Sequence, residues 1–245
     1  MNHTTYQPYP DVPLHVSEAG QGPAALVLHG GGGPASVQSI IDRLAQNHRV
    51  VAPTHPGWDE TPRPEWFDGV DDLVETYLDL IEDLDLKDVL VVGSSFGGWL
   101  ASEIAIRDRG HRLSSLILID AIGPNIAGHQ INFRPSGPLP TRTAVDAGPP
   151  IIPAAANIAA LQAYTGPTLA DPKLFHRLSR INVPTLVLWG ENDVVVTPAF
   201  GDAYAAAIPD AHFVLVPGAG HIPTREEPAA TFAAIDSFLN AVPAE

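Results

Sequence analysis

The sequence predicts a single α/β domain whose mostly parallel, twisted sheet is flanked by helices. Short runs rich in Val, Leu and Ile alternate along the chain with segments of helical periodicity. Most of these runs are apolar throughout, as strands buried on both faces of a parallel sheet are. The length of 245 residues suits one large α/β domain, and 45% hydrophobic residues supply its core. We therefore expect residues 1–245 to form one domain.

The expected strands are the six apolar runs, at residues 25–28, 49–52, 88–92, 116–119, 185–189 and 213–216. The expected helices lie between or after them, at residues 37–47, 70–84, 96–108, 198–207 and 228–240. Residues 14–18 alternate in polarity, and a glycine-containing turn at 19–22 separates them from the first of these strands. This pattern predicts an additional antiparallel hairpin at the edge of the sheet.

One segment, residues 123–180, interrupts this alternation. Residues 123–172 contain nine prolines and no clear strand, which predicts a lid insertion with short helices. Five basic against two acidic side chains also set residues 123–180 apart from the acidic remainder. Some aliphatic side chains of the segment either line a pocket for an apolar group or pack the lid onto the core; these are Ile151, Ile152, Ile158 and Leu161.

Composition excludes several classes of protein and of site. Thirteen basic against 28 acidic side chains give a formal charge of −15, which opposes nucleic acids and anionic lipid surfaces as partners. The absence of Cys excludes disulfides, thiolate catalysis and Cys-ligated metals. No basic leader precedes an apolar stretch, and no apolar run reaches the roughly 18 residues of a membrane-spanning helix. We expect a cytoplasmic protein that acts on a small molecule.

The strongest chemical motif is Gly93-Ser94-Ser95-Phe96-Gly97, which has the form G-x-S-x-G centred on Ser95. It follows an expected strand directly and opens an expected helix, the setting in which a tight turn exposes a nucleophilic hydroxyl above a sheet. Glycines flank the turn because side chains there would collide with the neighbouring strand and helix. The sequence therefore predicts Ser95 as a nucleophile.

A nucleophilic serine needs donors for the oxyanion that forms on its substrate. The N–H of Phe96, at the start of the helix, is one expected donor. The run His29-Gly30-Gly31-Gly32-Gly33 follows the strand at 25–28, and the N–H of Gly31 is the other. We expect His29 to hydrogen-bond structurally. A phosphate-binding loop is the alternative for this run, but the framing of the known phosphate motifs is absent.

The serine also needs a base and an acid that orients the base. His221 lies just after the last expected strand, where it can stand above the sheet. Asp193 follows the strand at 185–189, and Asp120 follows the strand at 116–119. Both acids lie at carboxyl ends of strands, where open α/β sheets place their sites. We favour Asp193, because the loops after the last two strands are neighbours and Asp120 would have to reach across a wider gap.

Ser95, Asp193 and His221 occur in this order, downstream of the His-Gly run, and the chain resembles the α/β-hydrolase superfamily in this. The resemblance spans nearly the whole chain through five motifs, at residues 29–33, 55–57, 93–97, 189–193 and 220–223. It implies the α/β-hydrolase fold and a serine hydrolase that cleaves a carboxylic ester or lactone of a small, partly apolar molecule. It also implies no metal and no organic cofactor.

Other activities share this scaffold. The runs at 29–32 and 95–98 are similar to carbon–carbon bond hydrolases of aromatic meta-cleavage pathways. Two departures are Gly33, a fourth glycine before Pro34, and Ile222, where that family often has Trp. A triad-bearing small-molecule sensor, a lyase and a cofactor-free oxygenase are the further alternatives. The sequence defines neither the natural substrate nor the oligomeric state.

Overall fold

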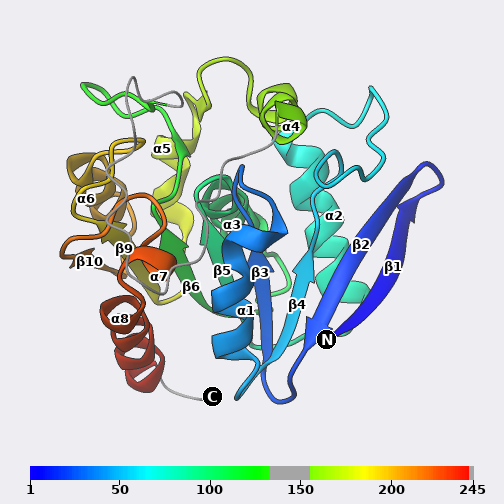
Figure 1. The fold of residues 1–245 in the computed structure, drawn as a ribbon, viewed down its shortest axis with the longest axis horizontal. Coiled ribbons are helices and arrows are strands. Elements are labelled where there is room, and N and C mark those ends of the chain that lie inside the picture. Colours follow the sequence, from blue (N-terminus) through cyan, green and yellow to red (C-terminus); the bar gives the residue numbers. More distant parts are fainter. Residues whose placement is uncertain (133–154, 243–245) are drawn as a thin grey trace.

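A computed structural model describes residues 1–132 and 155–242 of the chain and shows one large sheet at its centre (Figure 1). The sheet has eight strands in the order β1-β2-β4-β3-β5-β6-β9-β10. Their bounds are Asn2–Tyr9 (β1), Val12–Ala19 (β2), Ala24–Leu28 (β3), Arg49–Pro53 (β4), Val89–Ser94 (β5), Leu113–Ile119 (β6), Thr185–Gly190 (β9) and Ala211–Val216 (β10). Each of the six apolar runs forms a strand, and this is the α/β-hydrolase fold that the sequence predicts.

Strand pairing explains which part of the sheet is parallel. From β4 through β10 every neighbouring pair is parallel, whereas β2 runs antiparallel to both β1 and β4. The predicted antiparallel hairpin at the edge of the sheet is present, with residues 14–18 inside β2, but its partner strand precedes β2 and does not follow the turn at 19–22. The turn at 19–22 leads into β3, but both sides of β3 are taken by the parallel strands β4 and β5. The hairpin is formed instead by β2 with β1, and β1 is the true edge strand.

Helices cover both faces of the sheet, because alternate strand residues point to opposite sides. One face packs against α1 (Gln38–Leu44) and α8 (Pro228–Ala241). The other packs against α2 (Val70–Asp83), α3 (Phe96–Arg107) and α6 (Pro198–Ala206). Ala25 and Val27 enter the first core, while Leu26 and Leu28 enter the second. The five expected helices are present, and α1 ends three residues earlier than the periodicity predicts.

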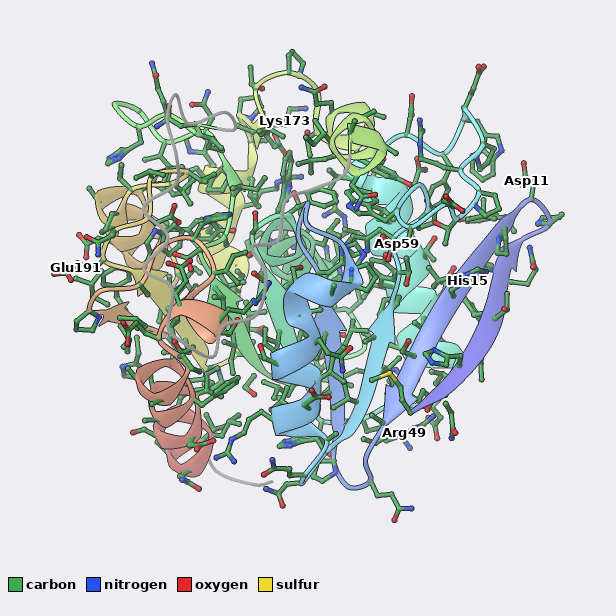
Figure 2. All side chains as sticks on the ribbon, in the orientation of Figure 1. Asp11, His15, Arg49, Asp59, Lys173 and Glu191 are labelled. Carbon is green, nitrogen blue, oxygen red and sulfur yellow. The ribbon has the colours of Figure 1, made fainter. Side chains whose placement is uncertain are left out.

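Short elements occupy the connections between the strands and the longer helices, and α4 lies above the carboxyl ends of the central strands (Figure 1). They are η1 (Pro34–Val37), α4 (Ala155–Thr165), α5 (Leu174–Arg177), η2 (Leu178–Arg180), α7 (Pro223–Glu226) and a two-residue parallel pair, β7 (Gly123–Pro124) with β8 (Ala170–Asp171). Figure 2 shows Arg49 at the start of β4 and Asp59 beyond its other end. Asp59 therefore marks the side of the sheet at which the parallel strands have their carboxyl ends. At the carboxyl ends of the parallel strands, the fold brings together loops that are far apart in the sequence.

The described parts of residues 123–180 are tied to the body of the domain. The buried carboxylate of Glu103 on α3 forms ion pairs with Arg107 and, at 2.7 Å, with Arg177. The hydroxyl of Tyr164 on α4 donates to the carbonyl of Pro56 at 2.9 Å. Leu161 is buried, which favours packing for this residue over an open lining position. Ile151 and Ile152 lie outside the described residues.

Among residues 1–132 and 155–242, no helix is both long enough and apolar enough to cross a membrane.

Candidate active site

Ser95 stands at a sharp turn between β5 and α3. Its φ of 53° is in the left-handed region, which costs energy for a residue other than glycine and is typical of nucleophile turns. Backbone bonds to the end of β6 fix the turn: Ser95 N–H donates to Ile119 at 2.9 Å, and its carbonyl accepts from Ile122 at 3.2 Å. A side chain at Gly93 or Gly97 would meet backbone atoms, as the sequence predicts.

His221 joins the serine to an aspartate. The Nε2 atom of His221 is 3.0 Å from the Oγ of Ser95, and its Nδ1 atom is 2.7 Å from the Oδ2 of Asp193. Because the carboxylate can only accept, Nδ1 carries the proton and Nε2 of the neutral ring faces the serine hydroxyl as an acceptor. The structure thus brings Ser95, His221 and Asp193 into one hydrogen-bonded chain.

Two loops place the histidine and its acid. Asp193 follows β9 and His221 follows β10, and these strands pair in parallel. The Oδ1 atom of Asp193 accepts from the N–H groups of Val195 at 2.7 Å and Val196 at 3.1 Å, so the carboxylate is held from both sides. This arrangement leaves Oδ2 free to face the ring of His221.

Glu226, which the sequence analysis did not single out, clamps the backbone around His221. Its Oε2 accepts from Gly220 N–H at 2.7 Å, and its Oε1 accepts from Ile222 N–H at 3.0 Å. These donors are the two chain neighbours of His221. The only signal in the sequence is the position of Glu226 five residues after the histidine, at the end of the turn that becomes α7.

The charges around His221 determine the direction in which its pKa shifts. Burial opposes a charged ring and would lower the pKa. The carboxylate of Asp193, its hydrogen bond and the more distant charge of Glu226 together overcome that effect, and the pKa of His221 lies above its ordinary value. The site therefore stabilises an imidazolium, the form that a general base reaches once it accepts a proton.

The expected oxyanion donors lie beside Ser95. Gly30 is so close to the serine that an added Cβ would lie 2.8 Å from the Cβ of Ser95 and 3.5 Å from its Oγ. In the part of the chain that the structure describes, no acceptor is bonded to the N–H of Gly31 or of Phe96. Both donors are thus available to a ligand atom near the serine.

A buried network fixes the loop that carries Gly30 and Gly31. His29 donates through Nδ1 to the carbonyl of Gly30 at 2.8 Å, and its Nε2 accepts from the N–H of His55 at 3.0 Å. The ring of His55 bonds the carbonyl of His29 at 2.9 Å and the hydroxyl of Tyr77 at 2.5 Å. The expectation of a structural role for His29 is confirmed. Burial lowers the pKa of His29 to about 4, so the ring stays neutral at neutral pH.

Asp120 lies much closer to the site than its place in the sequence indicates. Its carboxyl is fully buried, and a carboxyl oxygen, one of Asp193 and a ring nitrogen of His221 all lie within 4.8 Å of one another. The expectation of a gap between Asp120 and His221 is wrong. Strand β6 pairs directly with β9, and the left-handed backbone at Asp120, φ 44°, turns its carboxyl toward the loop after β9. The Oδ1 atom accepts from the N–H of Gly190 at 2.9 Å.

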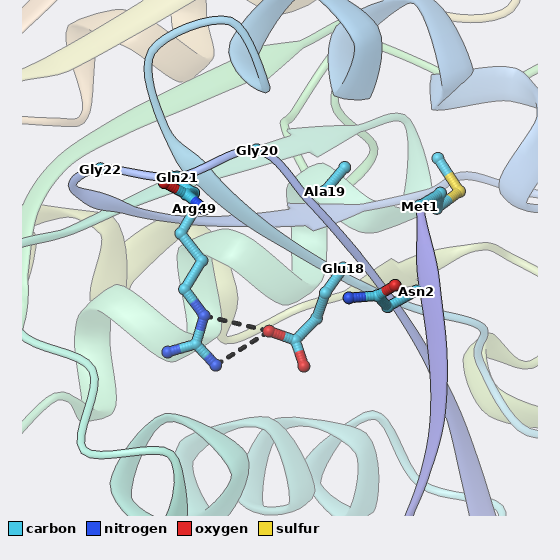
Figure 3. Close-up of a pocket in the computed structure, with 8 residues that line it drawn as sticks. All are labelled: Met1, Asn2, Glu18, Ala19, Gly20, Gln21, Gly22 and Arg49. Atoms are coloured by element: carbon cyan, nitrogen blue, oxygen red, sulfur yellow. Dashed lines mark hydrogen bonds and ion pairs between the residues drawn. The ribbon is translucent and has the colours of Figure 1, made fainter.

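A separate pocket lies near the amino-terminal ends of β3 and β4, away from the carboxyl ends that carry Ser95 and His221 (Figure 3). Its wall includes an ion pair in which both Nε and Nη2 of Arg49 bond Oε2 of Glu18, at 3.0 and 2.8 Å. The pocket is remote from the loops that carry Ser95 and His221. It contributes nothing to the serine-centred site.

The fold and the site together define the class of this protein. A serine on a strained strand–helix turn, hydrogen-bonded to a histidine that is itself bonded to an aspartate, both from later loops, is the arrangement of α/β hydrolases. Residues 25–235 match the model of the alpha/beta hydrolase family, and the chain belongs to that family. It is a hydrolase-family enzyme by fold and by sequence.

Similar proteins have several named activities. Lipase 3 of Moraxella sp. is 25% identical over 233 residues, which cover 84% of this chain and 73% of the lipase. A thermophilic esterase from Thermogutta terrifontis superposes with a TM-score of 0.80 at 24% identity, with 99% of each chain covered. A meta-cleavage product hydrolase from Pseudomonas fluorescens superposes with a TM-score of 0.72 at 21% identity, covering 95% of this chain and 96% of that one.

Proposed function

We propose that this protein hydrolyses carboxylic esters or lactones of small, partly apolar molecules through an acyl-enzyme on Ser95. The observation that carries the proposal is the chain of hydrogen bonds from Ser95 through His221 to Asp193, next to two unbonded N–H groups. Ester cleavage needs no more than this constellation, because each proton transfer and each charge has a group assigned to it. The lipase and esterase names among the similar proteins support it.

In the proposed mechanism, Ser95 Oγ attacks the carbonyl carbon while His221 Nε2 accepts the hydroxyl proton. Asp193 keeps the ring in the tautomer with Nδ1 protonated and stabilises the imidazolium. The N–H groups of Gly31 and Phe96 donate to the oxyanion of the tetrahedral intermediate. His221 then gives the proton to the leaving alcohol, and water, activated by the same ring, releases the acid and restores Ser95.

Carbon–carbon bond hydrolysis is the second candidate. Its support is a 2-hydroxy-6-oxo-2,4-heptadienoate hydrolase of Pseudomonas putida, 32% identical over 117 residues, which cover 46% of this chain and 42% of that one. That reaction requires a more specialised substrate than ester hydrolysis does, since its carbon leaving group must first be stabilised as an anion or protonated. The same Ser95 would carry it, so only the substrate range separates the two candidates.

The experiment is a rate panel with para-nitrophenyl esters of two to eight carbons, an aromatic lactone and a dienoate of the meta-cleavage type. The control is Ser95→Ala, which should reduce kcat by on the order of 10⁶ while leaving the thermal unfolding temperature nearly unchanged. A fluorophosphonate should label Ser95 and no other serine. Ligand-dependent thermal shifts without turnover of any substrate would reject the enzyme in favour of a sensor.

A further inference from the structure

The geometry points to Asp120 as a second, uncharged acid of the site, which donates a hydrogen bond to Asp193 and so positions the acid that orients His221. Asp120 is a positioning residue, because its carboxyl would act through Asp193, whose oxygen lies within 4.8 Å of it, and not on the reacting atoms. The catalytic consequence of this inference rests on the proposed function, but the protonation state of Asp120 can be measured independently of activity.

The first support is the hydrogen bonding of the Asp120 carboxyl. Oδ1 accepts from Gly190 N–H, whereas Oδ2 is fully buried and has no donor among the described residues. An ionised carboxylate buried in this way would leave a charged oxygen unsatisfied, which is expensive. A proton on Oδ2 converts that oxygen into a donor, and a carboxylate oxygen of Asp193, the acceptor that we assign to it, lies within 4.8 Å of the Asp120 carboxyl. Protonation would therefore give the unpartnered oxygen of the Asp120 carboxyl a hydrogen bond to make.

The second support is the charge around Asp120. The groups that face it are Asp193 from the loop after β9, and His221 and Glu226 from the loop and turn after β10. Two of these three are acidic, and both disfavour a further negative charge. Burial first, and the charge of Asp193 second, raise the pKa of Asp120 well above its usual value. Two carboxyls this close share a site most stably with one negative charge between them.

The arrangement has a consequence for catalysis. Asp193 already accepts from Val195 and Val196 on Oδ1 and bonds His221 through Oδ2. A hydrogen bond from Asp120 adds a further fixed contact from the end of the neighbouring strand β6, so the carboxylate of Asp193 cannot swing away when His221 becomes charged. A charged Asp120 would repel Asp193 and would also add its own charge to those that raise the pKa of His221.

The experiment compares the acid limb of the kcat/KM profile, which reports His221, in four proteins: wild type, Asp120→Asn, Asp120→Ala and Glu226→Gln. The amide of Asp120→Asn can accept from Gly190 and donate to Asp193, so it imitates the neutral acid. Its acid limb should coincide with that of wild type. Glu226→Gln removes a real charge and serves as the positive control, with the limb moved to lower pH. A comparable move in Asp120→Asn would show that Asp120 is ionised and would overturn the inference.

The Ala variant tests positioning. Asp120→Ala should lower kcat by about 10- to 100-fold, the loss expected for a hydrogen bond to a charged group, and Asp120→Asn should recover most of it. Equal losses in the two variants would contradict the role. Infrared difference spectra give a readout without any turnover: wild type at neutral pH should show a protonated-carboxyl band that Asp120→Asn lacks. If wild type lacks this band, Asp120 is not protonated and the inference is wrong, even if the protein is an esterase. If wild type shows the band but hydrolyses no substrate, only the proposed esterase function is wrong.

Discussion

Residues 29–33 approach Ser95 very closely at Gly30, and a single added methyl group there tests whether this loop supplies an oxyanion donor. In Gly30→Ala the new Cβ would lie 2.8 Å from the Cβ of Ser95 and 3.0 Å from the carbonyl oxygen of Ser94. Carbon atoms in contact are normally about 3.5–4.0 Å apart, so the loop or the serine must retreat by roughly 0.7–1.2 Å. Ser94 ends a central strand, and the loop is the part that can move.

A retreat of this size would break an oxyanion hydrogen bond. A bond of about 2.9 Å from the N–H of Gly31 would lengthen beyond about 3.5 Å, where it contributes little. The loss of one oxyanion donor costs about 10²–10³ in kcat. We expect Gly30→Ala to show that loss, measured with a para-nitrophenyl ester, and to change KM far less.

The neighbouring glycine supplies the matched control. In Gly31→Ala the nearest atom is the flexible Cδ2 of Leu161, at 3.1 Å, and the N–H itself is retained. Neither glycine has a positive φ, so both substitutions have the same effect on backbone freedom. Gly31→Ala should stay within about tenfold of wild type. Equal rates for the two variants, or a Gly30→Ala enzyme as fast as wild type with an unchanged unfolding temperature, would refute the placement of the donor in this loop.

Three further predictions follow from the same geometry. Asp193→Asn should cost about 10⁴ in kcat at an unchanged fold, because the amide favours the wrong tautomer of His221; turnover within tenfold of wild type would reassign the acid. Glu226→Gln should lower kcat about tenfold through the loss of one backbone bond, and should move the acid limb of kcat/KM to lower pH, because a charge that raises the pKa of His221 is gone. His29 should destabilise the fold in acid. Its pKa is lowered to about 4, so the unfolded chain binds more protons below about pH 6.5 and stability falls as pH falls. His29 alone should account for about 2 kcal/mol of the change in stability between pH 7 and pH 5 in urea unfolding, and His29→Gln should lack that part.

Local sequence patterns were sufficient for the elements and for the serine. Apolar runs such as residues 185–189 and helical periodicity such as residues 70–84 depend on neighbouring positions, so they identify strands and helices without the fold. The turn at Ser95 is equally local, because its strain and its glycines arise within five residues. His221 and Asp193 could be named because parallel strands end at one edge of the sheet.

Tertiary structure alone decided the pairing of strands and the surroundings of the acids. Strand β1 was missed because Asn2–Tyr9 is largely exposed and shows no apolar pattern, and its partner follows from which edge of the sheet remains open. The clamp by Glu226 uses main-chain N–H donors, which every residue except proline has, so composition cannot reveal it. Asp120 and Asp193 are 73 positions apart in the sequence, and only the pairing of β6 with β9 and the buried setting place their carboxyls together. The sequence by itself determined the candidate groups Ser95, Asp193 and His221, since each is a local side chain at the end of an expected strand. How the charges of these groups act on one another was decided by the fold, because the energy of a charge depends on its distances to groups that chain order does not specify.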